Sequence, residues 1–328
     1  MLLTFYFLCD IISEKYFHTP FIHSFAARDI KCTENIHKER NAYWELDMIN
    51  LGYYNGKYDL IENMTVPMND RACYFGDGIY EAVYTRNHII YALDEHLDRF
   101  YESAAVLGIA IPHTREELTD IIEGLVKKVD SGEQLVYFQV SRGTEMRNHA
   151  PSKGLVGNIW ITIKSAEIKD IYEPMSLITV EDTRFFHCNM KTLNLLPTVL
   201  ASKAAADAGA DEAVFHRGDR VTECAHSNIS IIREDGVLQT APADNMILAG
   251  VARAHLLKAC RSFGIAVEEK PFTVQEMMGA SEIIVTSSGT LCRPAEFIDG
   301  KRVGGGARET LKRLQDKLLG DFLSATEK

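Results

Sequence analysis

One lysine lies at a position where its surroundings could make its amine reactive. Lys191 falls in the segment HCNMKTLNLLPTVL, between the end of one expected strand and the start of an expected helix. Its neighbours are far more apolar than lysine usually has, and desolvation favours the neutral amine that attacks carbonyl groups. Lys191 is therefore a candidate nucleophile or Schiff-base former, although a solvated loop lysine would also fit this position taken alone.

A carboxylate in a second segment could bind a protonated ring nitrogen. Glu223 follows a hairpin turn in RGDRVTECAHSN and is flanked by small residues. A buried carboxylate stays charged only beside a cation or a protonated nitrogen. The alternative is a surface glutamate on a strand.

Two further segments offer donors for an anion. Gly250, Val251 and Ala252 begin an expected helix, whose free amides could hold a phosphate group. The hydroxyl cluster in VTSSGT, residues 285–290, could add donors to the same anion. Ordinary helix capping and an ordinary turn are the alternatives for these two segments.

A basic loop could bind a carboxylate. Arg147 and His149 in RGTEMRNHAP place two donors two residues apart, although a solvated basic loop would look the same. A lysine for an imine, an acid for a ring nitrogen, a helix start for phosphate and an arginine for a carboxylate are together what a pyridoxal-phosphate enzyme of amino-acid metabolism needs. The chain lacks HExxH, Walker A, GxSxG and GxGxxG motifs, which weakens the metalloprotease, nucleotide-hydrolase, serine-hydrolase and dinucleotide-binding interpretations.

Seven ordered blocks resemble a known family. They are YFGDGIYE, DEHLDRF, YFQVSRGTEMRNHAP, CNMKTLNLL, EAVFHRGDRVTECAHSN, NMILAGVAR and VTSS. In order and spacing they are similar to the class IV (fold type IV) pyridoxal-phosphate aminotransferases, from Met48 to the final helix. The RGTxxRxH block resembles the members that act on D-amino acids. The resemblance implies an α+β fold of two domains, a small α/β domain and a larger mixed domain with a barrel-like sheet.

The resemblance also implies a role for each cofactor-binding residue. Lys191 would carry pyridoxal 5'-phosphate and move the proton between Cα and the cofactor's C4′, and Glu223 would keep the pyridine nitrogen protonated. The remaining cofactor-binding residues would be the phosphate ligands Arg99, Val251, Ala252 and Ser288, and Leu248, which would pack against the ring.

A second set of residues would bind the substrate. Tyr80, Arg147 and His149 would hold the α-carboxylate and so select the enantiomer. Arg147 and His149 are expected from the neighbouring subunit, which implies a homodimer with shared active sites.

The implied reaction is ping-pong transamination of D-alanine and other D-amino acids with 2-oxoglutarate, giving D-glutamate and a 2-oxo acid such as pyruvate. The alternatives are branched-chain L-amino-acid transamination, aminodeoxychorismate lyase activity, or a non-catalytic paralogue that binds the cofactor. The chain departs from the family pattern at residues 224–227, Cys-Ala-His-Ser in place of a run containing serines, and at Ala252 in place of threonine. One lost hydroxyl donor would weaken cofactor binding by about 1 kcal/mol.

Local patterns place the elements that position these residues. Asn55-Gly56 predicts a hairpin turn. A helix is expected to start at the N-cap Asp94 and end at Gly108, and a second helix to start with the Thr114/Glu117 capping box and end at Gly132. Two later helices are expected, one with Pro197 in its first turn and one between Gly250 and Gly264. Residues 48–166 are expected to form the small domain and residues 167–328 the larger, cofactor-binding domain.

Composition limits the class of protein. The 328 residues carry a net charge of −11 without a basic patch, so nucleic acid is not an expected partner. Seven scattered cysteines without a CxxC pair indicate neither a disulfide framework nor a metal site, which fits a reducing cytoplasm.

The first 47 residues differ in composition from the rest of the chain. Their opening apolar run contains Asp10 and is too short to span a bilayer, so no membrane partner is expected. We expect an irregular or non-native extension, and the alternative is a poorly formed signal peptide with a cleavage site at residues 24–27.

Overall fold

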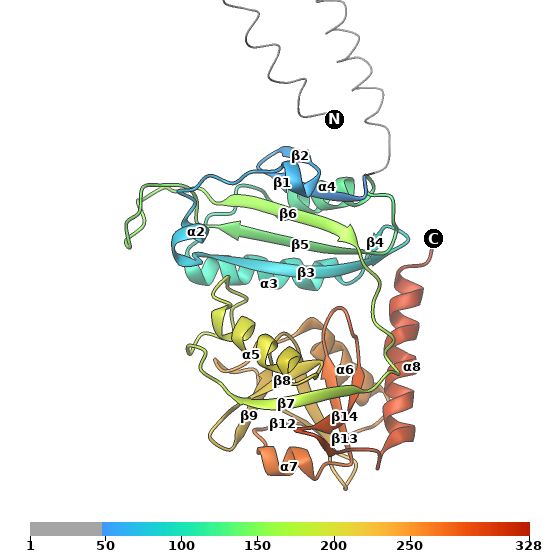
Figure 1. Ribbon diagram of the computed structural model, residues 1–328. Helices are drawn as coiled ribbons and strands as arrows, with labels where there is room; N and C mark the ends of the chain where they lie inside the picture. The colour runs from blue at the N-terminus through green and yellow to red at the C-terminus, as the bar shows by residue number, and fades with distance from the viewer. Residues whose placement is uncertain (1–47) are drawn as a thin grey trace, which may run out of the picture. The chain divides into compact units, whose positions relative to one another are not determined.

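The computed structural model describes residues 48–328 (Figure 1). The expectations for the first 47 residues, an irregular extension or a targeting segment, lie outside the described residues. The described residues form two β-sheets that follow one another along the chain and are joined by residues 166–174. We propose that residues 48–166 and 167–328 are the two domains, each built around one sheet.

The first sheet has six strands in the order β2-β1-β6-β5-β3-β4, and every neighbouring pair is antiparallel. Its strands are β1 (Asn50–Tyr54), β2 (Lys57–Asp59), β3 (Gly78–Arg86), β4 (Ile89–Ile90), β5 (Gln134–Ser141) and β6 (Asn158–Ser165). The turn between β1 and β2 has positive φ at Asn55 and Gly56, 44° and 89°, as a type I′ hairpin requires. The predicted hairpin is confirmed.

Two helices pack on this sheet, α3 (Leu93–Leu107) and α4 (Arg115–Val126). Alternate residues of β3 are buried, and the apolar ones share a core with the apolar stripe of α3. Two shorter helices, η2 (Ile61–Asn63) and α2 (Arg71–Phe75), lie between β2 and β3.

The ends of these helices correct two expectations. Asp94 is not the N-cap of α3, because the N-cap is Ala92, two residues earlier. The Asp94 carboxylate instead accepts a hydrogen bond from Arg115 at 3.0 Å. Helix α4 does begin with the Thr114/Glu117 capping box, but it ends at Val126 rather than at Gly132. It ends there because the chain turns to pair with Met48, whose amide donates to Lys128 O at 3.0 Å.

The second sheet curls into a partial barrel. Its order is β12-β11-β10-β13-β14-β7-β8-β9, with β15 paired to β14 and with β9 returning beside β10. Five pairs are antiparallel and three, β7-β8, β7-β14 and β11-β12, are parallel. The strands are β7 (Met175–Glu181), β8 (Glu212–Arg217), β9 (Arg220–Cys224), β10 (Asn228–Ile232), β11 (Leu238–Thr240), β12 (Val267–Glu269), β13 (Glu282–Thr286), β14 (Arg293–Ile298) and β15 (Lys301–Arg302).

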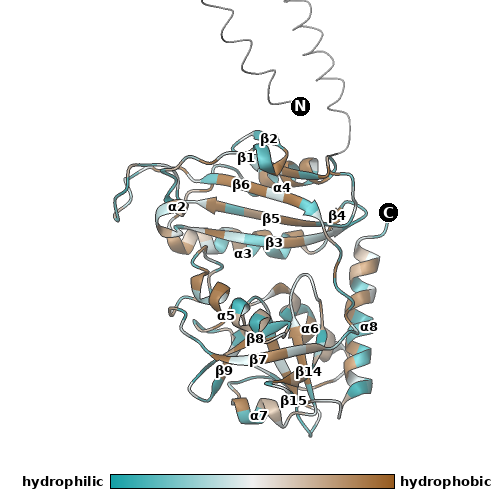
Figure 2. Ribbon diagram, viewed as in Figure 1, coloured by the Kyte–Doolittle hydropathy of each residue, from teal (hydrophilic) through white to brown (hydrophobic). Residues whose placement is uncertain are grey.

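Helices flank this sheet, and Figure 2 shows apolar residues concentrated along the strands of both sheets. The helices are α5 (Leu196–Asp207), α6 (Val251–Ser262), α7 (Val274–Met278) and α8 (Arg308–Ala325). As predicted, Pro197 lies in the first turn of α5, and α6 runs between Gly250 and Gly264. The expected mixed fold with a barrel-like sheet is confirmed. No helix within residues 48–328 is long and apolar enough to cross a membrane.

Candidate active site

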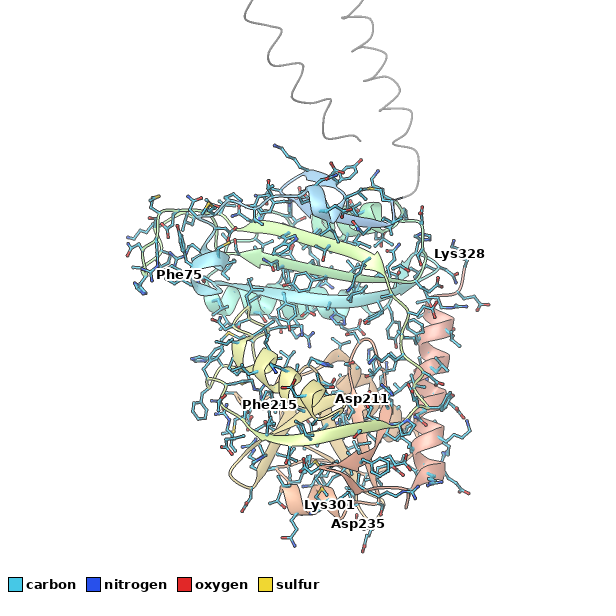
Figure 3. All side chains as sticks on the ribbon, in the orientation of Figure 1. Phe75, Asp211, Phe215, Asp235, Lys301 and Lys328 are labelled. Carbon is cyan, nitrogen blue, oxygen red and sulfur yellow. The ribbon has the colours of Figure 1, made fainter. Side chains whose placement is uncertain are left out.

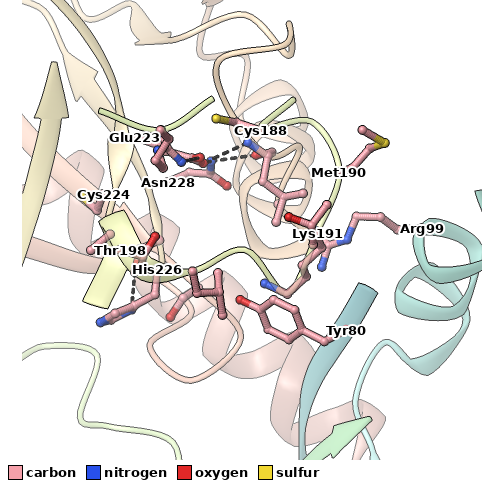
Figure 4. Close-up of a pocket in the computed structure, with 18 of the residues that line it drawn as sticks. Tyr80, Arg99, Cys188, Met190, Lys191, Thr198, Glu223, Cys224, His226 and Asn228 are labelled. Atoms are coloured by element: carbon pink, nitrogen blue, oxygen red, sulfur yellow. Dashed lines mark hydrogen bonds and ion pairs between the residues drawn. The ribbon is translucent and has the colours of Figure 1, made fainter. Parts of the chain in front are cut away.

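A pocket lies where β3 of the first sheet meets the loops of the second. Figure 4 shows side chains from both sheets converging on it. Eight of the ten residues predicted from the sequence line this pocket: Tyr80, Arg99, Lys191, Glu223, Leu248, Val251, Ala252 and Ser288.

Lys191 lies on a segment that pairs with β3. Its carbonyl accepts a hydrogen bond from the Tyr80 amide at 2.9 Å, and Thr192 forms a bridge with Ile79. The Lys191 Nζ lies 4.3 Å from the centroid of the Tyr80 ring, which in turn stacks on Tyr137 at 5.3 Å. The backbone pairing therefore fixes the amine beside the tyrosine.

Glu223 lies on β9 and is 5% exposed. Its Oε2 accepts hydrogen bonds from Asn228 Nδ2 at 2.9 Å and from the Leu248 amide at 3.0 Å, and its Oε1 pairs with Arg184. Burial raises the pKa of Glu223. The charge and hydrogen bond of Arg184 and the hydrogen bond from the Leu248 amide partly oppose this rise, and the resulting pKa of Glu223 is about 7. A carboxylate has about four acceptor sites, so three partners leave one free.

Asn228 joins Glu223 to the start of α6. Its Nδ2 also donates to Leu248 O at 2.8 Å, and a Cβ built on Gly250 would lie only 2.1 Å from its Oδ1. A Cβ at position 250 would therefore displace the Asn228 side chain. This close contact brings the N-terminus of α6 to the same pocket as the buried acid.

Arg184 was not singled out from the sequence. Asp182 fixes its guanidinium, with Nη2 to Oδ2 at 2.9 Å and Nε to Oδ1 at 3.0 Å. The guanidinium also lies 4.5 Å from the centroid of the buried Phe215 ring of β8 (Figure 3). Arg184 is therefore the counter-charge of Glu223. The sequence signal was an Asp and an Arg two residues apart at the end of β7.

Arg99 is held by an acid that the sequence analysis also missed. Its Nε and Nη2 donate to Glu81 Oε1 and Oε2 at 2.7 and 2.8 Å, and its Nη1 donates to Ala249 O at 2.9 Å. His96 Nδ1 lies 2.6 Å from the same carboxylate. Burial alone would raise the pKa of Glu81, but the charge of Arg99 and the hydrogen bonds from Arg99 and His96 outweigh burial and lower the pKa to about 2. Glu81 is thus a buried anion whose main role here is to fix Arg99.

Helix α6 begins without a side-chain cap. Its N-cap is Gly250, and the amides of Val251 and Ala252 in its first turn have no acceptor within the helix. Ser288 lines the pocket as well, with its Oγ 3.4 Å from His96 Nε2. These amides and the hydroxyl provide donors for an anion near Arg99.

The pocket residues fit pyridoxal phosphate, the cofactor that the sequence blocks imply. The amine of Lys191 suits the aldehyde, and the free acceptor site of Glu223 suits a protonated ring nitrogen. The uncapped start of α6 with Arg99 suits the phosphate. The aldehyde, the ring nitrogen and the phosphate of the cofactor therefore each have a suitable partner among the described residues.

Arg147 and His149 do not line the pocket. Both pack against Phe75 of α2, Arg147 at 5.2 Å and His149 at 5.3 Å from its ring centroid, at the edge of the molecule that Figure 3 labels. Arg71 fixes their loop, because its Nη1 and Nη2 donate to Asn148 O at 2.7 Å and to His149 O at 3.0 Å. The structure therefore presents these two donors outside their own pocket.

Comparison with known proteins identifies the family. Residues 78–298 match the family model described as Amino-transferase class IV. The chain is similar to the D-alanine aminotransferase of Listeria monocytogenes, 39% identical over 257 residues that cover 75% of this chain and 87% of the relative. It is similar to that of Bacillus licheniformis as well, 35% identical over 279 residues that cover 84% and 98%.

Solved structures show the same fold at lower identity. A branched-chain aminotransferase of Escherichia coli has a TM-score of 0.76 at 20% identity, covering 85% of this chain and 96% of that one. A PLP-bound hypothetical aminotransferase of Mycobacterium tuberculosis has a TM-score of 0.69 at 19% identity, covering 83% and 99%. The resemblance expected from the sequence blocks is confirmed. The chain belongs to the class IV aminotransferase family.

Proposed function

We propose that this protein is a pyridoxal-phosphate-dependent D-amino-acid aminotransferase. It exchanges the amino group of D-alanine and similar D-amino acids with 2-oxoglutarate, giving D-glutamate and a 2-oxo acid such as pyruvate. The observation that carries the proposal is the convergence of Lys191, Glu223 and the uncapped start of α6 on one pocket. The curated relatives in Listeria and Bacillus, which are D-alanine aminotransferases, support the choice of substrate.

The residues divide the chemistry between them. When bound, pyridoxal phosphate supplies a ring that accepts the electron pair left at Cα. Glu223 holds a proton at the ring nitrogen, since Arg184 and Asn228 occupy its other acceptor sites. Lys191 Nζ would take the proton from Cα and return it to the cofactor side of the substrate. Arg99, the amides of α6 and Ser288, which line the pocket, would hold the phosphate, and Leu248 would lie beside the ring.

The choice of enantiomer follows from the position of the α-carboxylate. Tyr80 lies beside Lys191, so a carboxylate bound at Tyr80 fixes which Cα hydrogen faces the amine. Arg147 and His149 complete this site from the partner subunit. A D-amino acid then presents its hydrogen to Lys191 and an L-amino acid presents it away.

A half-reaction screen tests the proposal. Purified holoenzyme is mixed with single D- and L-amino acids, and conversion of bound cofactor to its pyridoxamine form is followed by absorbance. D-alanine is expected to convert it and L-leucine is not. The reverse preference would show a branched-chain L-amino-acid enzyme. Reduction by borohydride at Lys191 without conversion by any amino acid would show a non-catalytic paralogue.

We also propose that the protein is a homodimer with shared active sites. Three large apolar side chains of α5 are more than half exposed in the single chain, Leu196, Val199 and Leu200. Arg147 and His149 pack on Phe75 and do not line the pocket of their own subunit. A mixing experiment tests this proposal. The variants Lys191→Ala and Arg147→Ala are each expected to be inactive, and re-associated mixtures are expected to regain activity, because the mixed dimer has one intact site. No recovery from a mixed dimer isolated by two affinity tags would contradict shared sites.

We further propose a cytoplasmic location. The five cysteines within the described residues, Cys73, Cys188, Cys224, Cys260 and Cys292, are all unpaired. Free thiols persist in a reducing compartment. Fractionation of cells that express the full chain tests the location, and enzyme in a membrane or secreted fraction would contradict it.

A further inference from the structure

Arg71, the first residue of α2, is a buried arginine that the proposed reaction does not use. It is 3% exposed and does not line the pocket around Lys191. A buried guanidinium requires acids and carbonyl oxygens that match its fixed fork of donors. The partners of Arg71 therefore show which part of the chain it holds in place.

Arg71 donates four hydrogen bonds within the described residues, and three of them go to the loop between β5 and β6. Its Nη1 donates to Glu145 Oε1 at 2.6 Å and to Asn148 O at 2.7 Å, and its Nη2 donates to His149 O at 3.0 Å. The fourth bond runs from Nε to Asp77 Oδ2 at 2.8 Å. One guanidinium thus binds three residues of the loop at once.

The loop that Arg71 binds is otherwise exposed. Every residue from 146 to 154 is exposed, including Arg147. Glu145 closes the loop on itself, because its Oε2 accepts the Ser152 amide at 3.2 Å while its Oε1 binds Arg71. The guanidinium groups of Arg71 and Arg147 both lie over the Phe75 ring, 4.9 and 5.2 Å from its centroid. Arg71 is therefore the buried anchor of an exposed loop.

A second arginine beside the same acid has a different role. Arg142 Nε donates to Asp77 Oδ2 at 2.9 Å, and its Nη1 donates to Leu107 O at 3.0 Å and Gly108 O at 2.9 Å, where α3 ends. Arg142 thus joins Asp77 to α3, whereas Arg71 joins Asp77 to the loop. A lysine in place of either arginine keeps the charge but loses the planar fork that reaches several acceptors in fixed directions.

We propose that Arg71 positions the loop that carries Arg147 and His149, and that it acts through this loop on the active site of the partner subunit. The inference rests on the proposed function and on the proposed shared sites, in which these two donors serve the partner's pocket. Arg71 binds the backbone between and at the two donors, so losing its contacts lets both move away from the substrate carboxylate. Its effect is therefore on substrate binding, and it appears in the other subunit.

Hybrid dimers with a single intact Lys191 test where Arg71 acts. Each hybrid is isolated with two affinity tags and contains one Lys191→Ala subunit. In the first hybrid, Arg71→Lys is in the subunit that keeps Lys191. In the second hybrid, Arg71→Lys is in the Lys191→Ala subunit. Both hybrids carry the same substitutions and share any cost in stability, so only the position of the altered loop relative to the intact lysine differs.

The second hybrid is expected to show a KM for D-alanine about tenfold above that of a reference hybrid without Arg71→Lys. Its kcat should change little, because the loop binds the substrate carboxylate and does not touch the reacting atoms. The first hybrid is expected to keep the reference KM. The matched control replaces Arg71→Lys by Arg142→Lys, which disturbs the same Asp77 but not the loop, and should leave KM unchanged in both hybrids.

The other outcomes overturn the proposal. They are a KM that rises in the first hybrid, in both hybrids or in neither, an equal effect of Arg142→Lys, and a chain that is monomeric. If wild type converts no amino acid, the proposed function fails, and the Kd of propionate decides between the hybrids instead, read from the absorbance of cofactor on the intact Lys191.

A second variant covers the case in which Arg71→Lys does not fold. Glu145→Gln leaves Arg71 bound to Asp77 but removes the acceptor for the Ser152 amide, since an amide NH2 group only donates. It is expected to raise KM in the second hybrid alone, by a smaller factor than Arg71→Lys. The same KM in both Glu145→Gln hybrids would overturn the proposal.

Discussion

Both carboxylate oxygens of Glu81 accept hydrogen bonds from Arg99, Oε1 from Nε at 2.7 Å and Oε2 from Nη2 at 2.8 Å. The Glu81 side chain is fully buried. An arginine fixed in this way presents its remaining N–H groups in one direction. The pair therefore sets the geometry of the proposed phosphate site before any phosphate arrives.

Replacing Glu81 by glutamine should weaken both the fold and cofactor binding. Glu81→Gln leaves the Arg99 charge without its buried partner, which typically costs about 3–5 kcal/mol. The loss is expected to be smaller in holoenzyme, because the cofactor phosphate can neutralise Arg99. Urea unfolding of apo- and holoenzyme measures the free energy of unfolding, and absorbance titration measures the cofactor Kd. The control is Glu102→Gln, an exposed position on α3, the helix that carries Arg99. Equal losses in apo- and holoenzyme would contradict the phosphate role.

The apoenzyme should lose stability as the pH rises through the pKa of Glu223. The pKa of this group is 4.5 unperturbed and about 7 when folded, because burial outweighs Arg184. A raised carboxyl pKa means that the folded state holds the proton more tightly, so stability falls between about pH 4.5 and 7. Relative to Glu223→Gln, wild type is expected to lose up to about 3 kcal/mol across this range. If the free energies of unfolding of the two proteins changed in parallel between pH 5 and 8, Glu223 would not titrate in that range.

Ala252→Thr should strengthen cofactor binding. Ala252 lines the pocket in the first turn of α6, where a threonine hydroxyl would add a donor to the phosphate. One such hydrogen bond lowers the cofactor Kd by up to about tenfold. Titration of apoenzyme with the cofactor measures the change. Ala254→Thr places the same residue on the exposed side of the same helix and is expected to leave the Kd unchanged, so equal effects of both variants would argue against the phosphate assignment.

Removal of residues 1–47 should leave the enzyme intact. Residues 48–328 form one compact unit that contains every residue of the proposed chemistry. The truncated chain is expected to fold, bind the cofactor and match the full chain in D-alanine half-reaction rate. Loss of cofactor or of soluble expression after truncation would show that the extension contributes to the fold.

Local features of the sequence predicted local structure well. The Asn55-Gly56 turn, the Thr114 capping box, Pro197 and Gly250 each act through backbone geometry within a few residues. Asp94 failed as an N-cap because a distant residue, Arg115, binds its carboxylate. Sequence alone does not show such a contact across two helices.

The charged contacts around the pocket could not be predicted from the sequence, because they also join residues that are distant in the chain. Arg184 and Glu223 are far apart in the chain, and the pairing of β7, β8 and β9 in the second sheet brings them together. Glu81 left a usable signal, because it occupies a buried position in the alternation of β3, where an acid requires a partner. Arg99 and His96, on the helix that packs against that strand, were the available partners.

The hydrogen bond from the Tyr80 amide to Lys191 O has a consequence for how the two sheets are connected. Lys191 lies between β7 and α5 in the chain, yet its backbone pairs with β3 of the first sheet. The residue with the proposed reactive amine therefore also links the two sheets, and its position beside Tyr80 depends on backbone pairing and not on what its side chain binds.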